Sequence, residues 1–373
     1  MWEIDRPWRR KRMVLFNCDY LEGAHEAILR RLAETNMQQE IGYGEDSFCE
    51  HARELIRAQV KDRDAYVQFI AGGTQTNMIL LSSMLRSHEG VIAADTGHIA
   101  VHESGAIEAT GHKVITLPNI EGKITAKQVE AYAAAHYADD THEHMVKPQV
   151  VFISFPSETG TIYSKAELKA LRKVCDKYGM YLYLDGARLG YGLMAETCDL
   201  KLSDIYKLTD AFYIGGTKQG ALLGEAAVIR NPALRKEFRY ILKQRGGMTA
   251  KGRILGIQFE VLFDGTGKDC LYFRLSSHAD RLALKFRDGL AALSVPVYQE
   301  SFTNQQFPVL PDRVLKKLSR EYSFAYWGRV DKNHSAVRFC MSWATKEEQV
   351  DRLLKKLEKL LKKKEEGDQN GLC

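Results

Sequence analysis

The segments YLYLDGAR, residues 181–188, and AFYIGGTKQG, residues 211–220, decide the fold of this chain. Both begin with a short apolar run of the kind that forms strands buried on both faces of a sheet. Asp185 ends the first run, and Lys218 follows the second, 33 residues later. This spacing suits one crossover between neighbouring parallel strands, and ligands gather at the carboxyl edge of such sheets. We therefore expect Asp185 and Lys218 at one sheet edge.

Apolar runs and helical patterns alternate through the rest of the central region. Three further runs have the short, apolar or β-branched character of buried strands: residues 91–93, 114–117 and 150–153. A helix is predicted from residue 165 to residue 178, because Ser164 stands at the expected cap and Gly179 at the expected stop. Alternation of this kind predicts an α/β fold in which helices cover a mostly parallel sheet.

The pattern changes after about residue 267, where a smaller C-terminal α/β domain is expected. Residues 271–293 and 346–361 have helical patterns, and residues 337–342 read as a strand. The predicted organisation has four parts: a basic N-terminal extension (1–15), a large domain (16–266), a small domain (267–361) and a disordered tail (362–373).

The composition argues against several classes of protein. With 373 residues, 45% apolar and 27% charged, the chain can bury a large core and has an ordinary soluble composition. Its net charge of +5 is concentrated at the two ends, which argues against a nucleic-acid-binding face. No apolar stretch approaches the ~20 residues that span a bilayer, and residues 1–13 lack the apolar core of a secretory signal. Seven cysteines without paired spacing favour a reduced, cytoplasmic location.

A glycine-rich turn, GGTQTN at residues 72–77, opens a helical stretch that extends to about Leu85. Glycines let the backbone approach a ligand closely, and the free amides of a helix start attract phosphate. Thr74 would add a hydroxyl group to such a site. A turn that only caps a structural helix is the alternative.

Asp185 and Lys218 are candidates for cofactor chemistry. A buried carboxylate needs a cationic partner, and the protonated pyridine nitrogen of pyridoxal phosphate (PLP) is one that enzymes commonly pair with aspartate. Capping of the following turn and pairing with Arg188 are the alternatives. Lys218 follows glycines that leave room for a ring, and its amine would bind PLP as a Schiff base, although most lysines are solvated surface residues. The phosphate turn, Asp185 and Lys218 together indicate a PLP enzyme.

These segments resemble the L-threonine aldolase and β-eliminating lyase family of fold-type I PLP enzymes, from about residue 17 to residue 343. The resemblance implies an aspartate-aminotransferase-like large domain that binds PLP, followed by a smaller C-terminal α/β domain. It is carried by GYGED (42–46), GTQTN (73–77), His98 with ESGA (103–106), DGAR (185–188), Lys218 and VRF (337–339).

Besides Arg188, the resemblance implies cofactor-binding roles for five residues. Gly73 and Thr74 would hold the phosphate, and His98 would stack on the ring. Asp185 would bind the pyridine nitrogen, and Lys218 would form the internal aldimine. His98 is also the candidate general base, because the unperturbed pKa of histidine lies near neutrality.

The resemblance also implies residues that contact the substrate. Arg188 and Arg338 would bind its carboxylate through the planar fork of the guanidinium, with Arg188 also at the cofactor. Cys18 matches a serine that lies near the substrate carboxylate in threonine aldolases, and a buried, unreactive cysteine is the alternative. Tyr43 would either pack in a turn or reach the active site of a neighbouring subunit.

Three segments depart from the family pattern. Residues 17–20 read NCDY in place of Arg-Ser-Asp-Thr, and residues 157–161, SETGT, lack the histidine that follows Glu-Asn-Thr in the family. Residues 246–249, GGMT, lack the arginine of Gly-Gly-Gly-Met-Arg. The cofactor assignment survives these changes, whereas the substrate does not follow from it.

The predicted function is the cleavage of L-threonine, L-allo-threonine or a related β-hydroxy-α-amino acid to glycine and an aldehyde. A β-eliminating lyase acting on a β-substituted amino acid and a non-catalytic PLP-fold sensor or scaffold are the alternatives. No metal is expected, because Ile99 stands where zinc peptidase helices carry a glutamate after the first histidine. The expected partners are a small amino acid substrate and further copies of the chain, in a dimer or a dimer of dimers, without nucleic acid or a membrane.

Overall fold

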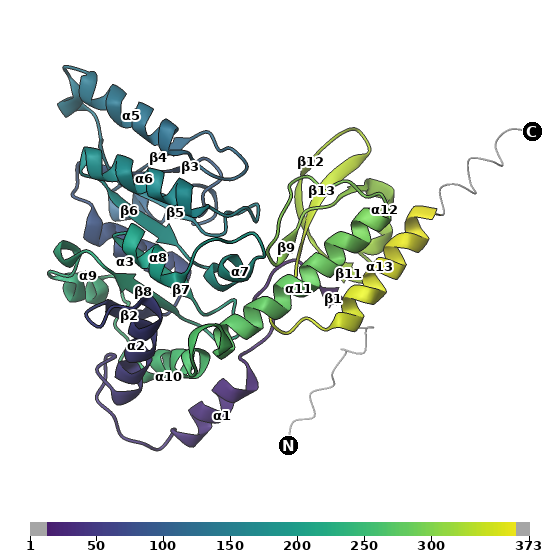
Figure 1. The fold of residues 1–373 in the computed structure, drawn as a ribbon, viewed down its shortest axis with the longest axis horizontal. Helices are drawn as coiled ribbons and strands as arrows, with labels where there is room; N and C mark the ends of the chain where they lie inside the picture. Colours follow the sequence, from purple (N-terminus) through teal and green to yellow (C-terminus); the bar gives the residue numbers. More distant parts are fainter. Residues whose placement is uncertain (1–12, 363–373) are drawn as a thin grey trace, which may run out of the picture. The chain divides into compact units, whose positions relative to one another are not determined.

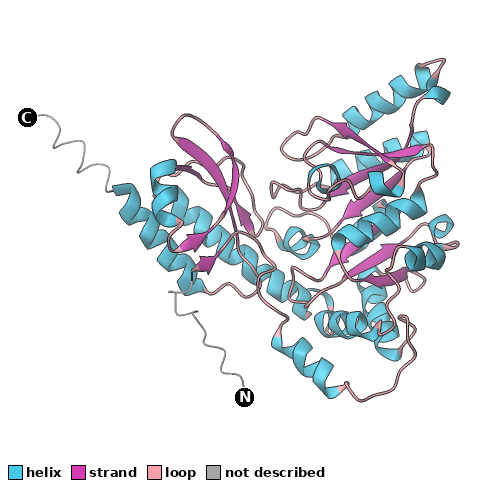
Figure 2. Cartoon of the chain, turned by 180° about the vertical axis from the view of Figure 1, so that it is seen from behind, coloured by secondary structure: helices cyan, strands magenta, loops and turns pink. Residues whose placement is uncertain are grey.

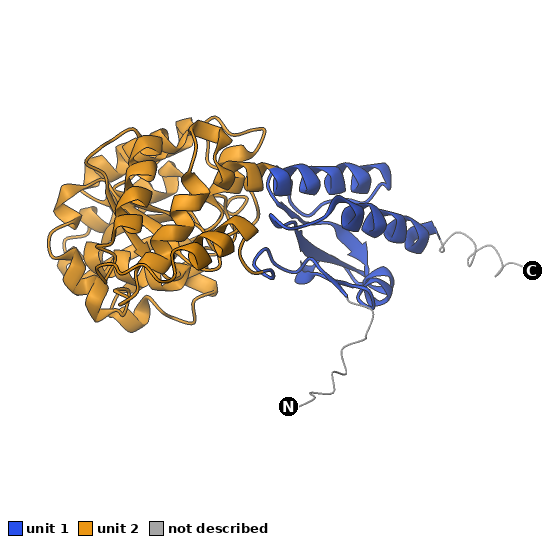
Figure 3. Cartoon of the chain, turned by 90° about the horizontal axis from the view of Figure 1, so that it is seen from below, with its two compact units in different colours: residues 1–22, 278–373 blue, residues 23–277 orange. Residues whose placement is uncertain are grey.

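The computed structural model describes residues 13–362, which form two compact units (Figure 3). Unit 2 comprises residues 23–277. Unit 1 comprises, in the described part of the chain, residues 13–22 and 278–362. Most of the predicted basic extension and nearly all of the predicted tail therefore lie outside the described residues.

Unit 2 is built around a seven-stranded sheet in the order β2-β8-β7-β6-β5-β3-β4 (Figure 1). The strands are β2 (Tyr66–Ile70), β3 (Glu89–Ala94), β4 (Lys113–Leu117), β5 (Lys147–Ser154), β6 (Tyr181–Asp185), β7 (Ala211–Gly215) and β8 (Glu225–Ile229). Strand β8 runs antiparallel to both of its neighbours, and the other neighbouring pairs are parallel. The predicted mostly parallel sheet is confirmed, and it contains all five strands expected from the sequence.

Helices cover both faces of this sheet (Figure 2). They are α1 (Glu26–Glu34), α2 (Ser47–Val60), α3 (Gly73–Met84), α4 (His98–Val101), α5 (Ala126–Ala138), α6 (Lys165–Tyr178), α7 (Leu189–Met194), α8 (Leu202–Leu208), α9 (Phe238–Gln244) and α10 (Arg253–Phe263). Because side chains alternate along a strand, Val151 and Ile153 of β5 join a core that includes α2, α5, α6, α8 and α10. Val150 and Phe152 join a second core with α3 and α9.

Helix α6 has the ends that the sequence predicted. The Ser164 hydroxyl accepts a hydrogen bond from the Glu167 amide at 3.2 Å, and the Glu167 carboxylate accepts one from the Ser164 amide at 2.7 Å. This reciprocal pair satisfies two amides at the start of the helix. Gly179 ends the helix with a φ of 64°, a left-handed conformation that glycine adopts without steric cost.

Among its described residues, unit 1 contains a four-stranded antiparallel sheet (β9, β10, β12 and β13), a two-stranded parallel pair (β1 and β11) and three helices or helix portions. Its strands are β1 (Val14–Leu15), β9 (Gln305–Gln306), β10 (Val309–Pro311), β11 (Tyr322–Ser323), β12 (Ala325–Arg329) and β13 (His334–Cys340). Its helices are α12 (Asp312–Leu318), α13 (Glu347–Lys362) and most of α11 (Leu271–Ala292). The two long helices and the strand predicted near residue 337 are confirmed. Between residues 13 and 362, no helix is both long and apolar enough to cross a membrane.

The N-terminal strand lies in a different unit from the one expected. The sequence placed residues 16–22 in the large domain, whereas the structure groups residues 13–22 with the C-terminal segment. Val14 pairs with Tyr322 in a parallel ladder, and Phe16 is buried in the core of unit 1. A two-residue strand whose partner lies near the other end of the chain leaves no local signal. The second boundary falls after residue 277, inside α11, and not after residue 266.

We expect Phe16→Ala to lower the free energy of unfolding by about 3–5 kcal/mol, because it removes an aromatic ring from a packed core. Phe16 is 1% exposed. Denaturant unfolding measures the change, and Met13→Ala is the control because Met13 is 44% exposed. A Phe16→Ala protein as stable as the wild type would contradict the assignment of this strand to the core of unit 1.

Candidate active site

Asp185 is a buried carboxylate at the carboxyl end of β6. The Tyr213 hydroxyl donates to its Oδ1 at 2.6 Å, and the Ala187 amide donates to the same oxygen at 2.9 Å. The Asn77 amide group donates to Oδ2 at 3.2 Å. The bond from Ala187 shows that Asp185 caps the following turn, as one alternative proposed. The donors from α3 and β7 also hold the carboxylate in one orientation, which a turn cap does not require.

Asn77 joins Asp185 to a second buried carboxylate. Its amide group also donates to Glu103 Oε1 at 2.7 Å, and its carbonyl oxygen accepts from the Tyr183 hydroxyl at 2.6 Å. The same Glu103 oxygen lies 2.7 Å from Nδ1 of His98. A continuous hydrogen-bonded chain therefore runs from Tyr183 through Asn77 and Glu103 to the imidazole of His98.

His98 stands at the first position of α4. Its amide donates to Glu158 Oε1 at 2.9 Å, and the same oxygen accepts from the Ser154 hydroxyl at 2.7 Å. Burial by itself lowers the pKa of His98, but the hydrogen bond to Glu103 and the charges of Asp185 and Glu103 outweigh it and raise the pKa above its ordinary value. The imidazole is therefore able to hold a proton near neutral pH.

The donor atoms of His98, Glu103 and Asp185 lie within 4.8 Å of one another, an arrangement that could also hold a metal ion. Hydrogen bonds account for this arrangement without an ion. Glu103 accepts from Asn77 and contacts His98, and Asp185 accepts from Asn77 as well. His102 is exposed, and the donor atoms that meet come from α4, from the bend that follows it and from the end of β6.

Lys218 follows β7 and lies at the same sheet edge as Asp185, as the spacing predicted. Strands β6 and β7 are neighbours and parallel. Lys218 is half-buried, and its carbonyl oxygen accepts a hydrogen bond of 2.5 Å from the Tyr191 hydroxyl. The Lys218 charge acts on His98, since it lowers the pKa of the imidazole. The structure therefore brings Asp185, His98 and Lys218 together in unit 2.

The start of α3 has the features of an anion site. Gly72 precedes the helix, and no side chain caps its first amides. A Cβ atom on Gly73 would lie 3.2 Å from the Tyr213 hydroxyl, closer than most such contacts. Thr74 is exposed in the first turn. Uncapped amides at the start of a twelve-residue helix suit a phosphate group.

Arg188 and Tyr43 lie in different surroundings within unit 2. Arg188 precedes α7, and its carbonyl oxygen accepts a hydrogen bond of 3.2 Å from the Gly192 amide. Tyr43 is 46% exposed, and the Lys243 ammonium lies 4.8 Å from the centre of its ring. Tyr43 lines a surface cavity of about 410 Å³ with Arg239, Tyr240, Lys243 and Met248.

Cys18 and Arg338 lie in unit 1, where Asn17 touches both of them. The Arg338 guanidinium donates to the Asn17 carbonyl oxygen at 3.2 Å and to Gln305 Oε1 at 3.3 Å. Its carbon lies 5.6 Å from the centre of the Trp327 ring. Cys18 is buried, and its sulfur accepts from the Asn17 side chain at 3.7 Å. The contacts hold the Arg338 guanidinium in a defined orientation.

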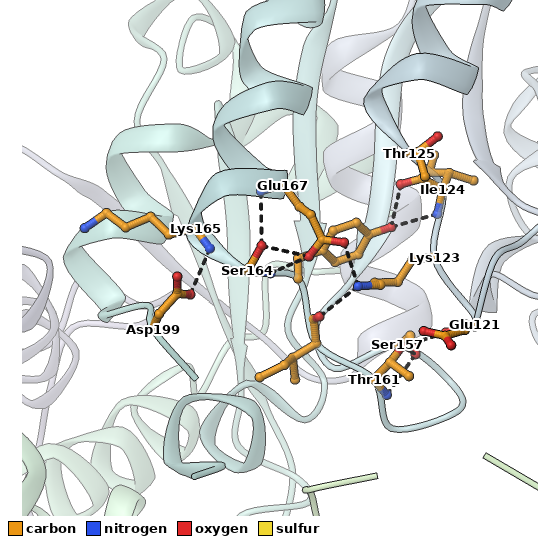
Figure 4. Close-up of polar contacts among 12 residues, drawn as sticks. Glu121, Lys123, Ile124, Thr125, Ser157, Thr161, Ser164, Lys165, Glu167 and Asp199 are labelled. Atoms are coloured by element: carbon orange, nitrogen blue, oxygen red, sulfur yellow. Dashed lines mark hydrogen bonds and ion pairs between the residues drawn. The ribbon is translucent and has the colours of Figure 1, made fainter. Parts of the chain in front are cut away.

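The segment that lacks the family histidine is a closed turn of hydroxyl groups (Figure 4). The Ser157 and Thr161 hydroxyl oxygens lie 2.6 Å apart, and Thr161 donates to the Glu121 carbonyl oxygen at 2.7 Å. A Cβ atom on Gly122, whose φ is +79°, would lie 2.4 Å from the Thr159 hydroxyl. Glycine at position 122 is therefore required for the two loops to approach each other.

The loop at residues 121–125 is also held against the start of α6 (Figure 4). The Lys123 ammonium donates to Glu167 at 2.7 Å and to the Ile162 carbonyl oxygen at 3.1 Å. The Tyr163 hydroxyl accepts from the Ile124 amide at 2.9 Å. These contacts fix the turn that follows Glu158.

Sequence reasoning assigned no role to five polar residues of the site: Asn77, Glu103, Glu158, Tyr213 and Glu225. Asn77 and Glu103 stand in segments that carry the family resemblance, and Glu158 stands in the SETGT segment, which departs from the family pattern. Tyr213 was read as an apolar strand residue, although a buried tyrosine hydroxyl generally requires a partner. Glu225 opens a strand that was not predicted, and a charged residue before an apolar run was the available signal.

The sequence of the chain matches a known family. The sequence model of the β-eliminating lyases matches residues 16–337. The chain belongs to this family. The low specificity L-threonine aldolase of Pseudomonas aeruginosa is 30% identical over 345 residues, which cover 91% of this chain and 95% of that protein. The low specificity L-threonine aldolase of Saccharomyces cerevisiae is 22% identical over 306 residues, which cover 79% and 76%.

Solved structures have the same fold as this β-eliminating lyase family member. The threonine aldolase of Leishmania major has a TM-score of 0.89 and is 43% identical, covering 93% of this chain and 99% of that structure. The aspartate aminotransferase of Thermus thermophilus has a TM-score of 0.67 at 14% identity, covering 93% and 91%, and shows the fold alone. The aspartate-aminotransferase-like fold implied by the sequence resemblance is confirmed.

We expect Glu103→Gln to lower the pKa of His98, because the amide removes the negative charge that favours the imidazolium form. Titration of the imidazole resonances by NMR in the cofactor-free protein measures this pKa. Glu108→Gln is the control, because Glu108 is an exposed glutamate close in sequence. An unchanged His98 pKa in Glu103→Gln would show that Glu103 does not control the imidazole.

Proposed function

We propose that this protein is a PLP-dependent carbon–carbon lyase that cleaves L-threonine, L-allo-threonine or a related β-hydroxy-α-amino acid to glycine and an aldehyde. One observation carries the proposal: Asp185 and Lys218 share a sheet edge in a chain 43% identical to the threonine aldolase of Leishmania major. An electron-sink cofactor needs an anchoring amine and an acidic partner, and these two side chains supply them.

The residues of unit 2 fit PLP at its pyridine nitrogen, its phosphate, its ring face and its aldehyde. Asp185, with donors on both oxygens, is placed to pair with a protonated pyridine nitrogen. The uncapped first turn of α3, with Gly73 and Thr74, suits the phosphate. The imidazole of His98 would stack on the ring, and Lys218 would hold the cofactor covalently.

The bound cofactor would supply an electron sink for the electron pair released when the Cα–Cβ bond of the substrate breaks. Asp185 would keep a proton on the ring nitrogen, which strengthens that sink. The donors from Tyr213 and Asn77 stabilise the Asp185 carboxylate in the orientation this task requires. Arg188 would contact the cofactor and the substrate carboxylate.

His98 would take the proton from the β-hydroxyl group of the substrate. Its Nδ1 faces Glu103, so Nε2 is the nitrogen that would accept this proton. Glu103 then stabilises the imidazolium that forms. The SETGT segment of this chain contains no histidine that could act as the base. We therefore assign the base role to His98.

Arg338 and Cys18 would have the substrate-binding roles that the family resemblance implies. The Arg338 guanidinium would bind the substrate carboxylate, a task for which its planar fork is suited. Asn17, Gln305 and Trp327 hold it in place. Cys18 would replace the serine hydroxyl of the family pattern with a thiol, which is a weaker hydrogen-bond donor.

We also propose that the protein acts in the cytoplasm and that it assembles with further copies of itself. Tyr43 and Tyr240 are 46% and 80% exposed and lie beside Met248 at one surface cavity. Exposed aromatic and methionine side chains are typical of protein interfaces. A dimer that shares its active sites through Tyr43, or a dimer of dimers, would cover them. The proposed partner otherwise is a small amino acid.

Purified protein incubated with L-threonine and L-allo-threonine should release glycine and an aldehyde, with a visible absorbance from bound PLP. Lys218→Ala should lose both the absorbance and the turnover, because the covalent link is gone. Lys207→Ala is the control, since Lys207 is an exposed lysine of the same unit. Ammonia and a keto acid as products would show β-elimination instead, and no reaction with any β-hydroxy amino acid would exclude the aldolase.

We expect His98→Phe to separate stacking from proton transfer. Phenylalanine keeps an aromatic ring but cannot accept a proton, so PLP should remain bound while kcat falls by about 10²–10⁴-fold. Steady-state kinetics with L-threonine and the absorbance of the bound cofactor give the two readouts. A fully active His98→Phe protein would assign the base role elsewhere.

A further inference from the structure

Glu225 is a buried carboxyl group beside Lys218 that the proposed mechanism does not use. It is the first residue of β8, where it pairs with Gly215 of β7 on one side and Ile70 of β2 on the other. Glu225 is 4% exposed. An ionised carboxylate in such a place is unstable without nearby donors or a cation.

The donors come from the residues that lead to Lys218. The Thr217 hydroxyl donates to Glu225 Oε1 at 2.9 Å, and the Gly216 amide donates to Oε2 at 3.1 Å. The Thr217 hydroxyl oxygen in turn accepts from the Gly224 amide at 3.1 Å. The carboxyl group therefore holds in place the two residues that directly precede Lys218.

Glu225 also interacts with Lys218 through its charge. Burial raises the pKa of Glu225 to about 8, although the Thr217 hydroxyl, the Lys218 charge and the Gly216 amide oppose the shift. A carboxyl group that titrates there can gain or lose a proton near neutral pH, which an ordinary glutamate does not do. The titratable groups that act on Glu225, or on which it acts, are Lys218, Asp185, Tyr183, Tyr213 and Tyr272.

Coupling between two titrating groups is reciprocal. Because the Lys218 charge favours the ionised form of Glu225, the ionised form of Glu225 must favour the charged form of Lys218. Of the groups named above, Lys218 carries the positive charge. When Lys218 loses its charge, Glu225 becomes easier to protonate.

We propose that Glu225 is the proton partner of Lys218: it holds the segment that carries the lysine and takes up a proton when the amine bonds to a carbonyl group. In this step a carbon–nitrogen double bond replaces the carbon–oxygen double bond of an aldehyde. The oxygen leaves as water with two of the ammonium protons, and the third proton moves to the Glu225 carboxylate. Charge and atoms balance without an external base. The identity of the carbonyl as PLP rests on the proposed function.

The first test uses the cofactor-free protein. Labelling of Lys218 by acetic anhydride at a series of pH values, followed by peptide mass spectrometry, gives the apparent pKa of its amine. Glu225→Gln keeps the shape and an acceptor oxygen but removes the charge. The apparent pKa of Lys218 should fall by about one unit or more, because the loss of a nearby opposite charge disfavours the protonated amine.

Matched variants separate charge from structure. Glu89→Gln changes another buried glutamate at the start of a strand of the same sheet, which pairs with Lys147 at 3.0 Å, and should leave Lys218 unchanged. Glu225→Asp retains the charge. Thr217→Val also retains it and removes the hydroxyl group that donates to Oε1 and accepts from the Gly224 amide. Neither variant should therefore lower the Lys218 pKa by as much as Glu225→Gln does. If Glu225→Gln fails to fold, a fall of about one unit in the Lys218 pKa in Thr217→Val, which keeps the Glu225 charge, would overturn the proposal.

The second test uses the PLP-loaded protein. The pH midpoint of its visible absorbance change reports the proton on the Lys218 nitrogen, and Glu225→Gln should move this midpoint to lower pH. The proposal is overturned if Glu225→Gln leaves the Lys218 pKa at the wild-type value, or if Glu225→Asp and Thr217→Val lower it as much as Glu225→Gln does. A protein that binds no PLP refutes the proposed function alone, because the labelling experiment still measures the pair.

Discussion

Asp185 places a carboxylate at the end of a buried strand, where a negative charge is stable only if hydrogen-bond donors surround it. Its donors come from the adjacent strand through Tyr213, from α3 through Asn77 and from the next turn through Ala187. The relative placement of β6, β7 and α3 is therefore tied to one charge. The segment that carries Lys218 lies at the same sheet edge as Asp185 because β6 and β7 are parallel neighbours. The start of α3 lies there as well, because Asn77 of this helix donates to Asp185.

Around this carboxylate, unit 2 buries three glutamates that each connect to a reactive group. Glu103 orients the imidazole of His98, and Glu158 accepts a hydrogen bond from the His98 amide. Glu225 accepts hydrogen bonds from Gly216 and Thr217, the two residues that precede Lys218. Buried carboxyl groups cost free energy unless they are bonded, so three of them in one region indicate that the protonation of His98 and Lys218 is under close electrostatic control.

The segments that depart from the family pattern are nevertheless ordered parts of the structure. The SETGT turn is closed by hydroxyl contacts with Glu121, and Gly122 leaves the space that the turn needs. Cys18 lies in unit 1 with Asn17 and Arg338. A change from histidine or serine at these positions alters the hydrogen-bonding groups offered to a substrate, and it leaves the elements around Asp185 in place.

The sequence by itself determined the features that depend on neighbouring residues. Apolar runs marked five strands, Ser164 and Gly179 marked the ends of α6, and one crossover length placed Asp185 and Lys218 at one edge. Tertiary structure alone decided which side chains meet there. Asn77 lies 108 residues before the carboxylate it binds, and residues 13–22 pair with a strand near the other end of the chain. Contacts between distant segments depend on the packing of a whole core, which no local pattern encodes.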